Sequence, residues 1–146
     1  MAETTVEDRI LIRELYDRYH WAMNHGDAEG VRACFRFDAI TVRYDGSAVT
    51  VDGVVETAQK GPTDPVSSTR QHHLTLLIVD PAEEGRDDRR AVRTYFILTE
   101  VRESPAIAIH SSCYTRDIVQ RIDGRWRFAA RRIQHTWPKP PLEPAT

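Results

Sequence analysis

The 146-residue sequence is poor in the features that identify secreted, membrane-bound and nucleic-acid-binding proteins. It has two cysteines, Cys34 and Cys113, which are too few for a disulfide framework, so we predict two free thiols. No apolar run approaches the roughly 20 residues that a membrane-spanning helix needs. Residues 1–8 are acidic and contain no apolar signal core, so we expect a cytoplasmic protein without membrane contact. With 20 basic against 22 acidic residues, nucleic-acid binding has no electrostatic support.

Motifs for cofactors are missing as well. The sequence contains no glycine-rich phosphate loop, no dinucleotide fingerprint and no Gly-x-Ser-x-Gly elbow. Adjacent strand histidines point to opposite sides, and no cysteine or carboxylate completes a metal-ligand set at a familiar spacing. We therefore expect neither a metal nor an organic cofactor. The histidines considered for a metal set are His72, His73, His110 and His135.

The composition is typical of one soluble globular domain. Hydrophobic residues make up 40% of the chain and charged residues 29%, which is the usual balance for such a domain. The length fits a single hydrophobic core, so we predict one domain over residues 1–146. Residues 138–146 form a proline-rich tail, and proline does not fit the interior of a sheet.

The chain begins with helical periodicity. Between residues 6 and 25, apolar residues recur at three- and four-residue spacing, which predicts a helix with one apolar stripe. Gly26 is a natural helix stop, and Asp27 can cap a second, shorter helix that carries Val31, Cys34 and Phe35. The stripe comprises Ile10, Leu11, Leu15, Tyr19, Ala22 and Met23.

The rest of the chain has mostly the pattern of strands. Asp45-Gly46 and Asp123-Gly124 are hairpin signals, and residues 54–60 fit one or two helical turns. Helices followed by a run of antiparallel strands predict an α+β fold, with the helices packed on one face of a curved sheet around a conical cavity. Strands are predicted over residues 39–44, 48–51, 71–79, 90–101, 107–121 and 125–136.

Three stretches resemble the SnoaL-like branch of the nuclear transport factor 2-like superfamily. Residues 12–27 (IRELYDRYHWAMNHGD) are similar to its opening helix, residues 69–74 (TRQHHL) to the strand that carries a pocket histidine, and residues 117–128 (DIVQRIDGRWRF) to a hairpin near its end. The resemblance implies a cystatin-like, cone-shaped α+β barrel, a homo-oligomer (dimer or trimer), and a deep pocket for a small molecule. The superfamily includes scytalone dehydratase, ketosteroid isomerase, a dehydrochlorinase, polyketide cyclases and small subunits of ring-hydroxylating dioxygenases.

The resemblance places the catalytic histidine at His73. Strand alternation puts His73 and His72 on opposite faces, so we expect His73 to line the cavity and His72 to point away from it. A histidine can remove a proton beside a leaving group and return one to it. Where the resemblance implies an aspartate that orients this histidine, the chain has Asn24. Its amide can orient an imidazole, but it cannot stabilise an imidazolium by charge.

Other residues are candidates to complete the site. Tyr19 is predicted to polarise or protonate a substrate oxygen, and Glu100 and Asp117 are alternative bases. Arg131 matches by count an active-site arginine that the resemblance implies, whereas simple alternation puts Arg132 on the face of the aromatic residues in the last strand. The predicted substrate contacts are Met23, Trp21, Phe96, His110, Cys113, Thr115, Arg131 and Trp137.

Together these residues predict a cofactor-independent lyase or isomerase, of the dehydratase or cyclase type, for a small, largely apolar cyclic or polyketide-like metabolite. His73 is the expected general acid/base, Tyr19 acts on the substrate oxygen, and Asn24 holds the histidine. The alternative is a non-catalytic small-molecule-binding or scaffold subunit, similar to the small subunits of ring-hydroxylating dioxygenases. Asn24 in place of a carboxylate favours that alternative.

Overall fold

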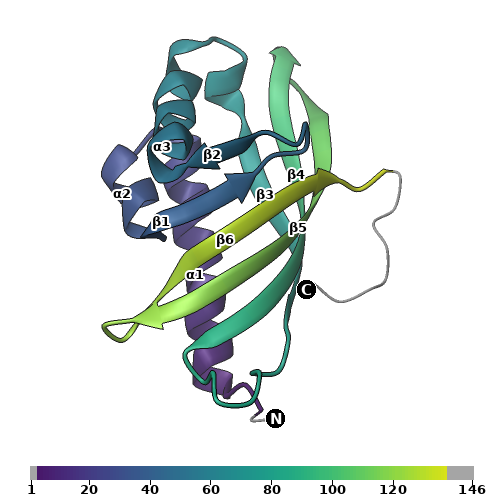
Figure 1. Ribbon diagram of the computed structural model, residues 1–146. Helices are drawn as coiled ribbons and strands as arrows, with labels where there is room; N and C mark the ends of the chain where they lie inside the picture. Colours follow the sequence, from purple (N-terminus) through teal and green to yellow (C-terminus); the bar gives the residue numbers. More distant parts are fainter. Residues whose placement is uncertain (1–2, 138–146) are drawn as a thin grey trace.

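Three helices pack against one face of a curved sheet (Figure 1). The computed structural model describes residues 3–137, so the predicted proline-rich tail, residues 138–146, lies outside the described residues. The helices are α1 (Val6–His25), α2 (Ala28–Ala33) and α3 (Val51–Lys60), and two 3-10 turns follow, η1 (Gly61–Thr63) and η2 (Ser67–Thr69).

The sheet has six strands in the order β2-β1-β6-β5-β4-β3, so β2 and β3 are its edges and the sheet stays open. The predicted α+β fold is confirmed, with one difference from a wholly antiparallel sheet: β1 and β6 pair in parallel. β6 is the last strand of the β3–β6 meander and reaches the free side of β1 running in the same direction. The strands are β1 (Phe35–Val42), β2 (Ala48–Thr50), β3 (Gln71–Val79), β4 (Arg89–Glu103), β5 (Ala106–Ile122) and β6 (Arg125–His135).

α1 begins and ends where the sequence predicts. Thr5 Oγ1 accepts a hydrogen bond from the backbone N–H of Asp8 at 3.0 Å, and Gly26 ends the helix in the left-handed region with φ 66°. The predicted apolar stripe is partly wrong, because Ile10 is 55% and Leu11 37% exposed. The true stripe is rotated and includes polar side chains, which apolar periodicity does not detect. The buried residues are Asp8, Ile12, Leu15, Tyr16, Tyr19, His20 and Ala22.

A β-bulge in β3 changes which of its residues face α1. The pairing with β4 skips one residue between Leu74 and Leu76. The inward-facing residues therefore switch from His72 and Leu74 before the bulge to Leu77 and Val79 after it.

A second bulge lies in β6, where the pairing with β5 skips one residue between Phe128 and Ala130. Phe128 and Arg131 consequently both face the interior, and Arg132 is exposed. The arginine that the family resemblance indicated is thus the buried one, and simple alternation was wrong.

Aromatic rings fill the centre of the core. The ring of Tyr19 packs edge-on against Phe35 and Phe128, with centroid separations of 5.6 and 5.4 Å. Both cysteines, Cys34 and Cys113, are buried free thiols, as predicted. The helical hairpin and the sheet therefore share one core, and the polar residues of α1 are held inside it.

Candidate functional site

A cavity of about 420 Å³ opens beside the C-terminal end of α1. Its walls come from the last turns of α1, from α3 with the η1–η2 segment, and from β3 and β4. Apolar and polar side chains share the lining, which suits a mainly apolar ligand with a few polar groups. Among its lining residues are Met23, Asn24, Lys60, Arg70, His72 and Leu98.

Asn24 and His72 form the polar centre of this cavity. Asn24 Oδ1 accepts a hydrogen bond from the backbone N–H of His72 at 3.1 Å, and the Nδ1 atom of the His72 ring lies 2.7 Å from the same oxygen. A backbone N–H can only donate, so the amide atom that faces it is the oxygen. Nδ1 of His72 must therefore carry the proton, which leaves Nε2 with a free lone pair.

His72 is surrounded by rings and by positive charge. Its imidazole stacks on that of His20 with a centroid separation of 4.9 Å and an interplanar angle of 10°, and both rings contact Phe96. Burial lowers the pKa of His72 to about 4, and the charges of Arg131 and Arg70 add to this effect. His72 is therefore neutral near pH 7, in the form that can accept a proton.

His20 is a buried histidine that the sequence reasoning missed. Its Nε2 has no hydrogen-bond partner among the described residues, and burial lowers its pKa well below the ordinary value. A signal was present in the sequence: Tyr16, His20 and Asn24 are spaced by four residues, which puts them on one face of a helix.

The predicted placement of His73 is wrong. His73 is exposed on the opposite face of β3, where its Nε2 lies 2.9 Å from Thr99 Oγ1. Alternation correctly separated the two histidines but did not decide which one faces inward. The bulge after Leu74 reverses the phase of β3. The partly buried Leu77 and the buried Val79 therefore lie on the face of His72, although simple alternation would place them with His73.

A separate polar cluster lies deeper, between α1 and β4–β6. The Asp117 carboxylate accepts hydrogen bonds from Tyr16 Oη at 2.6 Å, from Thr115 Oγ1 at 2.8 Å, and from Nε and Nη2 of Arg131, both at 3.1 Å. Thr94 Oγ1 is 2.5 Å from Thr115 Oγ1. All these side chains are buried. We call Tyr16, Thr94, Thr115, Asp117 and Arg131 the Asp117 cluster.

This arrangement corrects three predicted roles. Asp117 is engaged by four donors, so it is not a free base, and the guanidinium of Arg131 is bound to it rather than presented to the cavity. Tyr19 is buried among rings beneath Arg131, whose guanidinium lies 4.6 Å from the ring centroid. Burial raises the pKa of Tyr19, so its phenol stays protonated. Of the described residues that line the cavity, none belongs to this group.

The other predicted contacts divide between the cavity and its surroundings. Met23 lines the cavity, and Phe96 lies behind His72. Cys113 is buried beside Ser111, whereas His110 is exposed. Two tryptophans predicted as wall residues face outward instead, since the exposed fractions are 67% for Trp21 and 81% for Trp137.

Glu100, the other candidate base, is held by two arginines. Nε of Arg70 donates to Glu100 Oε2 at 2.9 Å, and Nε of Arg102 donates to Oε1. Both hydrogen bonds lower the pKa of Glu100, which suits an anchor rather than a proton acceptor. Arg70 itself lines the cavity, and nothing in the sequence distinguished it from other arginines.

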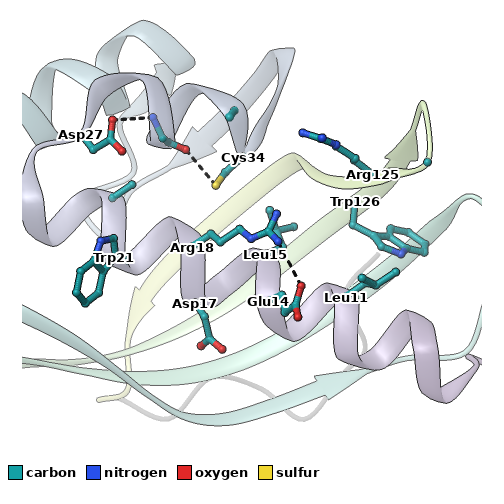
Figure 2. A pocket seen from close by; sticks show the side chains of 14 residues that line it. Leu11, Glu14, Leu15, Asp17, Arg18, Trp21, Asp27, Cys34, Arg125 and Trp126 are labelled. Carbon is teal, nitrogen blue, oxygen red and sulfur yellow. Dashed lines mark hydrogen bonds and ion pairs between the residues drawn. The ribbon is translucent and has the colours of Figure 1, made fainter.

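A second hollow, of about 450 Å³, lies on the outside of α1, between α2 and the β5–β6 turn (Figure 2). Most of its polar side chains already have partners: for example, Arg18 pairs with Glu14, and Asp27 caps α2. Burial raises the pKa of the Cys34 thiol to about 11, so the reactive thiolate is absent near neutral pH. The cavity beside His72 is therefore the better candidate site.

Within residues 3–137, no group of three or more His, Cys, Asp or Glu side chains is arranged to hold a metal ion. No helix in the described part of the chain is long and apolar enough to cross a membrane.

Comparison with known proteins identifies related folds. A family model for the SnoaL-like domain matches residues 4–132. A variant of Rv3472, a protein of unknown function from Mycobacterium tuberculosis, is 24% identical, with a TM-score of 0.76 over 88% of this chain and 72% of that one. Aln2 from a Streptomyces species is 20% identical, with a TM-score of 0.78 over 91% and 94% of the two chains. A protein from Catenulispora acidiphila, solved in complex with S-DNPA, is 21% identical, with a TM-score of 0.74 over 90% and 95%.

Identities at this level show a shared fold. Other solved structures of the same architecture are described as cystatin-like, which agrees with the curved sheet and helices described above. No curated protein matches this chain. Its chemistry must therefore be argued from its own residues.

Proposed function

This chain belongs to the SnoaL-like domain family, within a fold group that includes polyketide cyclases and dehydratases, and we propose that it is a cofactor-independent lyase or isomerase. Its substrate is a small, largely apolar cyclic or polyketide-like metabolite that binds in the cavity beside His72. His72, rather than His73, is the general acid/base, and Asn24 is its positioning residue.

One observation carries this proposal: Asn24 Oδ1 faces both the backbone N–H and the ring Nδ1 of His72 inside the cavity. The two contacts fix the ring and its tautomer, so Nε2 is the available base. A low pKa keeps this nitrogen unprotonated near pH 7. The Catenulispora acidiphila relative, which has the same fold, is itself in complex with a compound, S-DNPA.

The chemical steps follow from that geometry. His72 Nε2 takes a proton from a carbon next to a carbonyl group, and the electrons of the broken C–H bond form an enolate. The imidazolium then returns the proton. If it protonates a hydroxyl group on the neighbouring carbon, water leaves and the reaction is a dehydration; if it protonates a different carbon, the reaction is an isomerisation.

The experiment uses hydrogen–deuterium exchange, which reports proton abstraction without requiring the natural product. The rate at which 1-tetralone exchanges the protons beside its carbonyl is measured by NMR in D₂O, above the uncatalysed rate. We expect His72→Gln to lower the enzymatic rate about 10²–10⁴-fold. The matched control is His73→Gln, on the other face of β3, which we expect to leave the rate unchanged. Equal losses in both variants, or no loss in His72→Gln, would contradict the proposal.

A second candidate is a protein that binds the same class of metabolite without transforming it. The amide of Asn24 supports it, because it cannot stabilise the imidazolium by charge as a carboxylate does. Within residues 3–137, no carboxylate contacts the His72 ring. In the exchange experiment this candidate predicts binding of 1-tetralone, seen as NMR line broadening, with exchange at the uncatalysed rate in every variant.

We also propose that the chain forms a homo-oligomer, a dimer or trimer, through the outer face of the sheet. Ile40, Leu76, Ile78 and Tyr95 lie on this face and are 38–42% exposed. Large apolar side chains that stay partly exposed on a sheet face are typical of a surface that a partner covers. Light scattering at micromolar concentrations should give a mass of at least twice 16.8 kDa. A monomer at all concentrations would rule the oligomer out.

A further inference from the structure

We propose that Arg70 determines the specificity of this cavity and selects ligands that carry an anionic oxygen, such as a cyclic or aromatic carboxylate or enolate. The inference rests on the proposed function, because it names the substrate class of the same site. It concerns a residue outside the Asn24–His72 pair.

One side of the Arg70 guanidinium is bound by Glu100, and the rest of it faces the cavity. Its Nε donates to Glu100 Oε2 at 2.9 Å, and Glu100 is 1% exposed, with its other oxygen bound by Arg102. A guanidinium has five N–H donors, and within residues 3–137 only Nε of Arg70 has a hydrogen-bond partner. The side chain keeps 35% of its surface exposed and lines the cavity with His72. The terminal amino groups are thus available to a planar acceptor.

The other charged groups of the cavity wall have local partners. Lys60 pairs with Glu56 at 2.8 Å. The Asp64 carboxylate turns into its own loop, where Oδ1 accepts from the backbone N–H groups of Val66 at 3.1 Å and Ser67 at 2.6 Å. Arg70 is consequently the charged group of this wall that can bind a ligand while its own ion pair, with Glu100, stays intact.

The chemistry of proton abstraction calls for such a group. Removing a proton next to a carbonyl group transfers negative charge to the carbonyl oxygen, and a preorganised cation at that oxygen stabilises the enolate. A bound anion also offsets the positive charge of Arg70, which helps to depress the pKa of His72. Binding of an anion should therefore favour proton uptake by His72.

Two matched probes test the inference: 2-naphthoate, which is an anion, and 2-naphthamide, which has the same ring system without the charge. Affinities are measured by isothermal titration calorimetry. In the wild type we expect 2-naphthoate to bind about 10–100-fold more tightly, the range for hydrogen bonds to a charged group. Arg70→Gln should remove this preference by weakening the binding of 2-naphthoate far more than that of 2-naphthamide, and the binding of 2-naphthamide that remains shows that the variant is folded.

Arg102→Gln is the matched control, because Arg102 also binds Glu100 but is not among the described residues that line the cavity. It should keep the preference for 2-naphthoate. Equal losses in both variants would overturn the inference, since the preference would then depend on Glu100 and not on a contact with Arg70. An unchanged preference in Arg70→Gln would overturn it as well.

The outcomes also separate this inference from the proposed function. If 2-naphthamide binds and 2-naphthoate binds no more tightly, the role of Arg70 is wrong and the apolar cavity stands. If neither probe binds, the proposed ligand class and the inference both fail. NMR titration adds a second readout: 2-naphthoate should raise the pKa of His72 from about 4, and 2-naphthamide should not.

Discussion

Two polar regions are enclosed by the same sheet, and they differ in how completely their groups are paired. In the Asp117 cluster, the carboxylate receives hydrogen bonds from Tyr16, from Thr115 and twice from Arg131. At the cavity, one amide oxygen holds His72 from one side, and its Nε2 has no hydrogen-bond partner among residues 3–137. His20 Nε2, stacked beside it, has none in that range either.

The difference separates a structural role from a chemical one. A buried ion pair of this kind fixes the fold, because removing one partner leaves the other charge buried without its counter-charge. A buried ring with a free lone pair can take up a proton from something that enters. The degree of pairing, more than the presence of ionisable residues, therefore distinguishes the candidate site from the deeper cluster.

The largest expected effect follows from breaking the paired region. Asp117→Asn leaves the buried guanidinium of Arg131 without its counter-charge, so we expect the free energy of unfolding to fall by about 3–5 kcal/mol. Urea denaturation measures this change. The control is Asp38→Asn, which breaks an exposed pair with Arg36 and should cost less than about 1 kcal/mol.

A double variant sharpens the test of this cluster. Replacing both partners, Asp117→Leu with Arg131→Met, removes two buried charges together and should cost less than Asp117→Asn alone. A double variant that is less stable than the single one would indicate that the hydrogen bonds of Tyr16 and Thr115, and not the ion pair, dominate the stability of the cluster.

The next largest effect is a change in the pKa of His72 when a negative charge is added beside it in the cavity. In Asn24→Asp, a carboxylate replaces the amide oxygen beside Nδ1 of His72, which stabilises the imidazolium. We expect the pKa of His72 to rise from about 4 by about 1–3 pH units. NMR titration of the ring measures it. The acidic limb of the exchange rate with 1-tetralone should move to higher pH by the same amount, because the base must be unprotonated.

If the pKa of His72 did not change in Asn24→Asp, the side chains at positions 24 and 72 would not be in contact. A shift of the pKa without a shift of the acidic limb would mean that His72 is not the base, and would favour the binding protein. His73→Asp serves as a control, because it adds a carboxylate on the exposed face of the same strand.

Much of the fold could be predicted from local signals. The helix over residues 6–25, its Gly26 stop and the Asp27 cap of α2 depend on backbone chemistry within a few residues, and all three are confirmed. The hairpin signals Asp45-Gly46 and Asp123-Gly124 also hold, with positive φ at Gly46, Asp123 and Gly124. Element ends differ by a few residues: Phe35, which was predicted in the second helix, begins β1, and α3 begins at Val51.

The site could be predicted only in part, because its geometry depends on two bulges. Alternation fixes which residues share a face only as long as the register is unbroken. The bulge after Leu74 puts Leu77 and Val79 on the face of His72 rather than that of His73, with no sign in the residue types. The bulge before Ala130 brought Arg131 inside in the same way. The partnership of Arg131 with Asp117 requires β5 and β6 to be in register, which is a tertiary property.

The smallest expected effect concerns how the two stacked histidines couple stability to pH. Burial lowers the pKa of both His20 and His72 relative to an unfolded chain, in which a histidine has a pKa near 6.5. Below that value the unfolded state binds more protons than the folded state, so the free energy of unfolding falls as the pH falls. For His72 the loss develops between about pH 6.5 and 4 and is complete below that range.

Urea denaturation between pH 5 and 6.5 isolates this effect, since the lowered carboxyl pKa values, such as that of Glu100, place their titration at lower pH. Each neutral histidine contributes a slope of up to about 1.4 kcal/mol per pH unit. His72→Gln and His20→Phe should each reduce the slope, because neither replacement titrates. His73→Gln changes an exposed ring and should leave it nearly as in the wild type. If the slope of the free energy of unfolding against pH were unchanged in both His72→Gln and His20→Phe, the pH-sensitive groups would lie elsewhere in the chain. The contrast between the fully paired Asp117 cluster and the sparsely paired cavity would then not hold.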